Sequence, residues 1–207
     1  MSMVQKVMAK FYREAAGDPS KLPWHREDPD NTLASAVRAC APGSRALDVG
    51  CGAGVFSVWM ADQGLQVTGI DLFPEATAMA QKLAAGKPGR KLEFVTGDLF
   101  TYAPGQPFDR VCDSGCLHSL VGGSVPAYKQ QLLSWLAPRG TYVLEHWGKR
   151  NAFDWRPIGP RRRSETAIQG IFAPELRAEE SHSEDFQAPF PFGPWVRGVS
   201  YRMTRAV

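Results

Sequence analysis

Long apolar runs are missing from this chain of 207 residues. Its uninterrupted apolar stretches fall far short of the roughly 18 residues that a membrane-spanning helix needs, so no membrane association is expected. Charged residues interrupt the N-terminal segment MSMVQKVMAKFYREAAG, which therefore lacks the apolar core of a signal peptide. Together these absences predict a cytoplasmic protein.

Cysteine is scarce as well, with four residues at Cys40, Cys51, Cys112 and Cys116. No two of them form a Cys-x-x-Cys pair, and no histidine stands at zinc-site spacing from them. The sequence therefore predicts free, reduced thiols and neither a disulfide framework nor a bound metal.

An excess of one charge is also missing. The chain has 24 Lys and Arg against 21 Asp and Glu, a net charge of +3. A balance this weak does not by itself indicate a nucleic-acid partner. The 43% of apolar residues and 22% of charged residues argue against disorder. The length, without internal repeats, predicts a single domain.

What the chain does have is a regular alternation of helix-period and strand-period segments. Helices are expected over residues 3–16, 33–40, 55–63, 74–85 and 125–136. Strands are expected over residues 45–49, 65–71, 91–96, 108–112 and 141–146, followed by a hairpin of strands near 175–187 and 196–206. Such alternation predicts an α/β fold, a parallel sheet with helices on both faces.

The first predicted strand leads into a glycine-rich turn. Leu47-Asp48-Val49 is followed by Gly50-x-Gly52-x-Gly54 and then by a helix. Such a turn lets the backbone approach a ligand closely, and the helix N-terminus directs N–H groups at it. Asp71 ends the next strand about 20 residues later, where a carboxylate can accept both hydroxyls of a ribose. A nucleoside-containing cofactor is therefore predicted.

Two residues distinguish between possible cofactors. Dinucleotide-binding turns have a third small residue where this chain has Val55, which disfavours a nicotinamide-dependent reductase. Asp48 lies inside the strand, where a carboxylate suits an ammonium group better than a pyrophosphate. A ligand with a ribose at one end and an amino acid at the other is S-adenosylmethionine (SAM).

Five ordered motifs carry a family resemblance. LDVGCGAG, VTGID, GDLF, FDRVCDSG and LAPRGTYVLEHW, spread over residues 44–147, resemble the successive motifs of the class I SAM-dependent methyltransferases. More narrowly, Pro23-Trp24-His25 and the run from Asp113 to Ser119 resemble bacterial small-molecule methyltransferases of the halide/thiol and heterocyclic-toxin type. Methyl transfer to a small acceptor, such as a thiol, a phenol or an N-heterocycle, is thus expected.

The resemblance also implies an architecture. The family fold is a Rossmann-like, doubly wound sheet of seven strands in the order 3-2-1-4-5-7-6, with strand 7 antiparallel. The single domain would consist of an N-terminal helix and lid (1–30), a SAM-binding core (44–146), a substrate loop (147–170) and a C-terminal hairpin (171–207). A monomer or a homodimer would fit this size.

The same resemblance implies which residues contact SAM, which becomes S-adenosylhomocysteine. Four groups are expected: the methionine end, the ribose, the adenine and a lid. The methionine end would be contacted by Asp48, Gly50, Cys51, Gly52, Gly54 and Asp113. The ribose would be contacted by Asp71 and Leu72, and the adenine by Asp98 and Leu99. The lid would be formed by Tyr12 and Trp24. The sulfonium is already activated, so neither a metal nor a covalent intermediate is needed.

The acceptor side is less defined by the sequence. His118 follows the fourth strand and is either a catalytic base or a hydrogen-bonded wall of the pocket. His146, after the fifth strand, is either a second base or a solvent-exposed loop residue. An aromatic substrate wall is expected from Phe11, Trp147, Phe153 and Trp155.

Arg161-Arg162-Arg163 permits two interpretations, a solvated turn or a clamp for an anionic acceptor or RNA. Base-methylating enzymes carry an Asn/Asp-Pro-Pro-aromatic run where this chain has Asp113-Ser-Gly-Cys, which disfavours nucleic acid as substrate. A non-catalytic SAM-binding or RNA-associated protein remains the alternative function.

Overall fold

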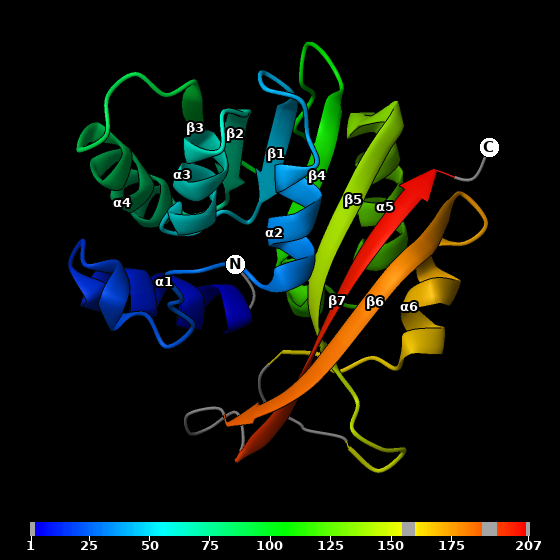
Figure 1. Ribbon diagram of the computed structural model, residues 1–207. Helices are drawn as coiled ribbons and strands as arrows, with labels where there is room; N and C mark the ends of the chain where they lie inside the picture. The colour runs from blue at the N-terminus through cyan, green and yellow to red at the C-terminus, as the bar shows by residue number, and fades with distance from the viewer. Residues whose placement is uncertain (1–2, 155–159, 188–193, 206–207) are drawn as a thin grey trace.

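The computed structural model describes residues 3–154, 160–187 and 194–205 (Figure 1). The helices are α1 (Met3–Ala15), α2 (Asn31–Arg38), α3 (Val55–Asp62), α4 (Pro74–Ala85), α5 (Ser124–Trp135) and α6 (Glu165–Phe172), with short 3-10 turns at Pro19–Lys21 and Leu117–Ser119. The strands are β1 (Arg45–Val49), β2 (Gln66–Asp71), β3 (Leu92–Thr96), β4 (Phe108–Ser114), β5 (Leu136–Gly148), β6 (Leu176–Gln187) and β7 (Trp195–Arg205). In these ranges no helix combines the length and the apolarity that crossing a membrane requires.

The strands form one sheet in the order β3-β2-β1-β4-β5-β7-β6 within the described residues. Neighbours from β3 to β5 pair in parallel, whereas β7 pairs antiparallel with both β5 and β6. The predicted Rossmann-like order, with strand 7 antiparallel, is therefore confirmed. Parallel pairing brings the carboxyl ends of β1, β2 and β4 to the same edge of the sheet, where open α/β folds bind their ligands.

Alternating side chains of the strands supply two separate cores. Leu47 and Tyr142 point to the face covered by α5 and α6. Their chain neighbours Ala46 and Val143 point to the face covered by α2 and α3. Figure 1 shows these helices on opposite sides of the sheet. Because both faces of the central strands are covered, β1 and β2 are buried at almost every position, and this made them visible in the sequence.

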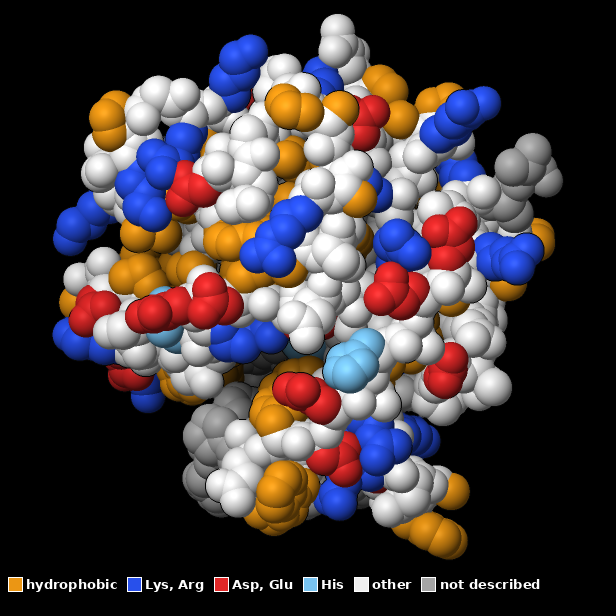
Figure 2. Space-filling view, viewed as in Figure 1, with side chains coloured by type: hydrophobic (Ala, Val, Ile, Leu, Met, Phe, Trp, Pro, Cys, Tyr) orange, Lys and Arg blue, Asp and Glu red, His pale blue; other side chains and the backbone are white. Residues whose placement is uncertain are grey.

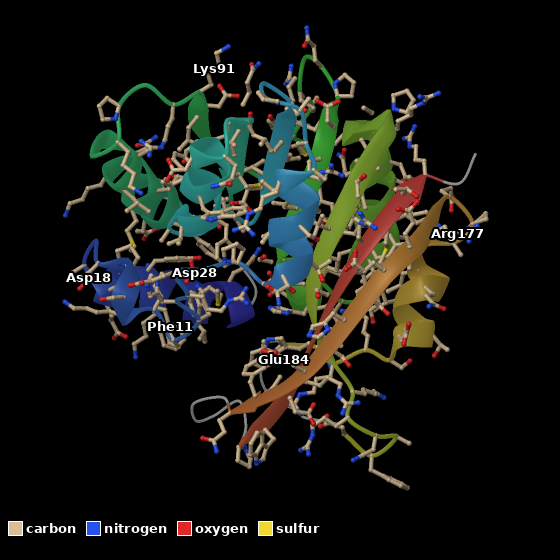
Figure 3. All side chains as sticks on the ribbon, viewed as in Figure 1. Phe11, Asp18, Asp28, Lys91, Arg177 and Glu184 are labelled. Carbon is tan, nitrogen blue, oxygen red and sulfur yellow. The ribbon has the colours of Figure 1, made fainter. Side chains whose placement is uncertain are left out.

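α1 lies below α3 and α4, beyond the edge where β1 and β2 end (Figure 1). Its residues Tyr12 and Ala15 pack with Leu22 against Ala76 and Met79 of α4, so a third small apolar cluster holds α1 in place. Figure 3 shows the segment that carries Asp18 and Asp28 running along this helix. The chain thus crosses the carboxyl edge of the sheet before it enters the sheet.

Helix α6 was not expected, because residues 147–170 were predicted as a loop. The Ser164 Oγ atom caps the helix by accepting from the N–H of Ala167 at 3.2 Å, and Ile168 and Phe172 are buried against the sheet. This pattern is a normal helix start followed by an apolar stripe. The exposed Gly170 and the preceding Pro- and Arg-rich run hid it in the sequence.

Strand β5 begins earlier than predicted, at Leu136 rather than near Thr141. Pro138 and Gly140 suggested a break, since proline cannot donate to a strand ladder. The structure accommodates both residues through an irregularity in the β4–β5 pairing between Phe108 and Arg110. The strand therefore continues through Pro138 with a shift in register.

Trp135 tests the core on the α5 face. Its side chain is fully buried, and its Nε1–H donates to the carbonyl of Tyr102 at 3.0 Å. We expect Trp135→Ala to lower the free energy of unfolding by about 3–5 kcal/mol through the cavity it leaves. Phe153→Ala, at a side chain that is 94% exposed, should change it by less than about 0.5 kcal/mol. Urea titration measures both, and equal losses would contradict this assignment of the core.

Candidate cofactor and acceptor site

The Gly50 turn, residues 50–54, connects β1 to α3 in a conformation that favours glycine. Gly50, Gly52 and Gly54 have φ angles of +68°, +55° and +76°. A Cβ atom on Gly54 would lie 2.6 Å from the Cβ of Ala80 and 2.8 Å from the ring of Phe94. One side of the turn is therefore packed against α4 and β3. The turn itself lies at the carboxyl edge of the sheet.

Asp71 holds this turn in place from the end of β2. One carboxylate oxygen accepts from the N–H of Gly52 at 2.9 Å, and the other accepts from the N–H of Phe73 at 2.9 Å. Burial raises the pKa of Asp71 above its usual range. Each oxygen has a second lone pair available, which suits a ligand that donates two hydroxyl groups.

Asp48 is buried inside β1 at 4% exposure, with the Ser57 hydroxyl donating to its carboxylate. The pKa of Asp48 is raised to about 7, mainly by burial. The negative charges of Asp113 and Asp71 also raise it, and the Ser57 hydrogen bond acts in the opposite direction. A carboxylate in this position is only half ionised near neutrality. A cationic ligand would restore its charge.

Asp113 ends β4 and organises the loop that follows. Its carboxylate accepts from the N–H groups of Gly115, Cys116 and Leu117 at 2.6–3.1 Å, and from the Tyr128 hydroxyl at 2.6 Å. The side chain is therefore saturated by the protein itself. This loop rests on the Gly50 turn, because a Cβ on Gly50 would lie 3.0 Å from the Cβ of Cys116.

The three aspartates form a carboxylate cluster without a cation. Across the described residues, the carboxylates of Asp48, Asp71 and Asp113 form no ion pair: no Lys, Arg or His nitrogen lies within 4.0 Å of them. Buried charges normally have a partner, because an unpaired one is costly to remove from water. The cluster therefore suits a positively charged ligand.

A histidine cluster is formed by the turn after β4 and the last residues of β5. The ring centroids of His118 and His146 are 5.8 Å apart, and the Trp147 ring is 5.7 Å from His118. The Nδ1 atoms of both histidines are buried without a hydrogen-bond partner among the described residues. Burial, together with the Arg163 charge, lowers the pKa of His118 to about 3 and holds that of His146 well below its usual value.

These observations correct two expectations about the histidines. His146 belongs to β5 and is 2% exposed, so the solvent-exposed loop position considered for it is wrong. The near-neutral pKa expected of His118 is also contradicted, because burial disfavours the charged imidazolium and lowers that pKa to about 3. Both rings are neutral hydrogen-bonding groups at physiological pH.

The N-terminal aromatics reach the Gly50 turn. The Tyr12 hydroxyl lies 3.0 Å from the position of a Cβ on Gly52, and burial raises the pKa of Tyr12 above its usual value. Phe11 and Tyr12 both meet the Trp24 ring edge-on, with centroids 5.4 and 5.7 Å apart. Figure 3 shows Phe11 on α1.

The remaining predicted residues differ in how closely they join the site. The Cys51 sulfur packs beside Gly69, Leu72 is 41% exposed, and Leu99 is half-buried. Asp98 is exposed and accepts from the N–H of Phe100 at 2.9 Å. Phe153 is 94% exposed, so it builds no wall, and Trp155 lies outside the described residues.

Sequence reasoning missed two connections of the site. Glu145 of β5 forms an ion pair with Arg26, whose guanidinium lies over the Phe56 ring at 5.1 Å. Arg163 donates to the carbonyls of Leu117 and Leu120, at 3.3 and 2.8 Å. Arg163 was noted only as part of an arginine run, and no spacing rule connects residue 163 with the loop after β4.

Comparison with known proteins agrees with this geometry. Residues 46–140 match the family model described as a methyltransferase domain. The chain is 31% identical over 190 residues to the ubiquinone biosynthesis O-methyltransferase of Xanthomonas campestris pv. campestris, covering 90% of this chain and 74% of that protein. It is 26% identical over 172 residues to the 2-heptyl-1-hydroxyquinolin-4(1H)-one methyltransferase of Mycobacteroides abscessus, covering 81% and 75% of the two chains.

A solved structure shares the fold. The magnesium protoporphyrin IX methyltransferase of Synechocystis with bound SAM superposes with a TM-score of 0.72 at 19% identity, over 100% of this chain and 99% of that one. The chain belongs to the methyltransferase-domain family of class I SAM-dependent methyltransferases. The nicotinamide-dependent reductase considered from the sequence is thereby set aside.

The residues present fit SAM. Its ammonium and sulfonium groups are the positive charges that the carboxylate cluster lacks. Within the described residues, no group of three or more His, Cys, Asp or Glu side chains is arranged to hold a metal ion.

The Gly50 turn generates a stability prediction with a matched control. We expect Gly54→Ala to lower the free energy of unfolding by more than about 2 kcal/mol, because it combines backbone strain with overpacking against Ala80 and Phe94. Gly64→Ala has φ +90° but nothing within 4 Å of its Cβ, so it reports the backbone strain alone. Thermal and urea unfolding measure the difference, and equal effects would show that the turn is loosely packed.

Proposed function

We propose that this methyltransferase transfers the methyl group of SAM to a nucleophilic sulfur, oxygen or nitrogen atom of a small acceptor, and that the acceptor binds at the histidine cluster. One observation carries the proposal. The loop after β4 touches the Gly50 turn through Cys116, and the same loop bears His118. The cofactor turn and the histidine cluster are therefore neighbours across a single loop.

The roles expected from the family resemblance become part of this proposal. Asp48, the Gly50 turn with Cys51, and the loop held by Asp113 would surround the methionine end of SAM. Asp71 and Leu72 would bind the ribose, and Asp98 and Leu99 the adenine. When bound, SAM supplies a methyl group on a positively charged sulfonium. The contribution of Asp113 is to position the loop, since its oxygens are already hydrogen-bonded.

The protein's task in this scheme is to align the acceptor and exclude water. Trp147 offers an apolar surface beside His118, which supports a flat, aromatic acceptor. A ubiquinone-biosynthesis O-methyltransferase and a hydroxyquinolinone methyltransferase among the relatives support the same class. Residues 1–30 would form a lid, tied down by the ion pairs Arg13–Glu75 and Arg26–Glu145.

The surface supports a small-molecule acceptor more than a nucleic acid. Figure 2 shows Lys and Arg interspersed with Asp and Glu over the visible face, without a continuous basic field. Nucleic-acid binding depends on such a field. We keep a cytoplasmic location and a monomeric or homodimeric state as predictions.

A methyl-transfer screen tests the function. Purified protein with labelled SAM should methylate at least one member of a panel of thiols, phenols and N-heterocycles. Asp71→Ala should weaken SAM binding by about 1.5–3 kcal/mol, the usual loss for hydrogen bonds to a charged group. Asp62→Ala, which removes a surface carboxylate paired with Arg90, should not. Tight SAM binding without transfer to any acceptor would favour the non-catalytic alternative.

Binding of SAM should also release a proton near neutrality. Since the pKa of Asp48 is raised to about 7, much of this carboxyl is protonated at about pH 6 before binding. A bound ammonium lowers that pKa, so the affinity should rise with pH up to about 7 and then level off.

Calorimetry in buffers of different ionisation enthalpy counts the released proton. Asp48→Asn should abolish the release and flatten the pH dependence of affinity. A release that persists at pH 6 in this variant belongs to Asp113, whose pKa burial raises to about 6. An unchanged release at pH 7 would contradict the placement of Asp48 beside the ammonium group.

A further inference from the structure

The three consecutive arginines of the sequence have three different environments. The Arg161 side chain is exposed. The Arg162 guanidinium forms a buried ion pair with Asp154 at 2.6 Å, in which the two side chains are 3% and 8% exposed. Arg163 is half-buried and reaches the histidine cluster, where its Nη1 atom lies 3.5 Å from Nε2 of His146. The run is therefore neither one solvated turn nor one clamp.

Arg163 has hydrogen-bond partners but no counter-charge. Its printed acceptors are the neutral carbonyls of Leu117 and Leu120 and the neutral imidazole of His146. No carboxylate within the described ranges lies within 4.0 Å of its guanidinium. Arg163 also lines an open hollow of about 320 Å³ with Val121, Gly122, Arg161 and Arg162. A half-buried guanidinium in this situation can accept an anionic partner.

The histidines beside Arg163 are arranged as donors rather than bases. A guanidinium only donates hydrogen bonds, so Nε2 of His146, which faces it, is the acceptor nitrogen and Nδ1 carries the hydrogen. That Nδ1–H is buried without an acceptor among the described residues, on a side chain that is 2% exposed. This Nδ1–H points away from Arg163 and is enclosed by the protein, so the His146 ring lines the acceptor region as a neutral group that need not act as a base.

The site is thus divided into two charge regions. The cofactor side contains the carboxylate cluster and no cation, whereas the acceptor side contains Arg163 and no carboxylate partner for it. The loop from Asp113 to Ser119 separates them. This division favours a positively charged ligand on one side and a negatively charged one on the other.

We propose that the acceptor binds as an anion, with its acidic S–H or O–H group already ionised, and that the Arg163 guanidinium is the charge that holds the negative atom. The inference rests on the proposed function and specifies its acceptor: an aromatic thiol, a phenol or an N-hydroxy heterocycle rather than a neutral alcohol or amine. The acceptor loses its proton to solvent, so no histidine has to act as a base.

The chemical balance of the step is simple. The acceptor anion forms a bond to the methyl carbon with its own electron pair, while the bond from that carbon to the sulfonium breaks and its electron pair stays on sulfur. One positive and one negative charge disappear, and no further reactant is required. The acidic groups nearest Arg163 on the packed elements are Asp113 of β4 and Tyr142 of β5, and the basic groups are Arg161, His118 and His146.

Binding of a chromophore tests the proposal without methyl transfer. The probe is 4-nitrophenol, of which only the ionised form absorbs strongly in visible light, added to the full-length protein saturated with S-adenosylhomocysteine. We expect its apparent pKa to fall by about 1–3 on binding, as for an acid placed beside a guanidinium. The uncharged analogue 4-nitroaniline should bind about tenfold more weakly or worse.

Variants assign the effect to Arg163. Arg163→Gln should remove the lowering of the probe's pKa and weaken its binding about tenfold. Arg163→Lys should keep the lowering with weaker binding, because it keeps the charge but loses the planar fork. Arg177→Gln, with the same loss of charge at an exposed side chain of β6 that does not line the hollow, should behave as the parent protein. If Arg163→Gln does not fold, the proposal is tested by comparing the probe's pKa and affinity between Arg163→Lys and the parent protein.

Several outcomes overturn the proposal: binding of the protonated phenol, no binding of the probe at millimolar concentration, equal binding of 4-nitroaniline, or an equal effect of Arg177→Gln. The result is separable from the proposed function. Ionised probe on the protein without transfer from labelled SAM to any acceptor leaves the anion site and rejects the enzyme activity. Transfer with a bound probe that stays protonated rejects the anion site and leaves the activity.

Discussion

Three carboxylates are buried at one edge of the sheet without a cation among the described residues, and the site is organised around this electrostatic constraint. Asp71 uses its oxygens to fix the Gly50 turn, Asp113 uses its oxygens to fix the loop after β4, and Asp48 has only the Ser57 hydroxyl. Two of the three charges are therefore stabilised by backbone N–H groups. The pKa of the third carboxyl, Asp48, is raised to about 7, so its charged form is stabilised only when a cationic ligand is present.

Most of the fold could be predicted from the sequence, because its signals are local. Strands buried on both faces read as apolar runs, and the Gly50 turn and Asp71 stand at a spacing that only a strand–turn–helix unit explains. The failures are equally local in origin. Gly170 hid helix α6, and Pro138 concealed the first residues of β5, since both residues usually mark breaks.

The acceptor side of the site could not be predicted to the same degree, because it depends on contacts between distant segments. From their positions after strands, the sequence indicated that His118 is either a base or a wall of the pocket, and that His146 is either a base or an exposed loop residue. It did not reveal that packing against Trp147 and Arg163 would bury both rings and make them neutral. Burial and charge partners set a pKa, and neither can be read from a residue's neighbours in the chain.

The position of β6 at the outer edge of the sheet has a consequence for how copies of the chain meet. Its exposed side chains include Glu179, Glu180, Glu184 and Asp185, which Arg202 and Arg197 neutralise only in part. If a second copy added its own β6 antiparallel to this edge, the acidic pairs at the two ends of the strand would stand opposite one another. Like charges directly across a ladder repel, so this edge resists sheet extension and aggregation although its backbone groups are free to pair.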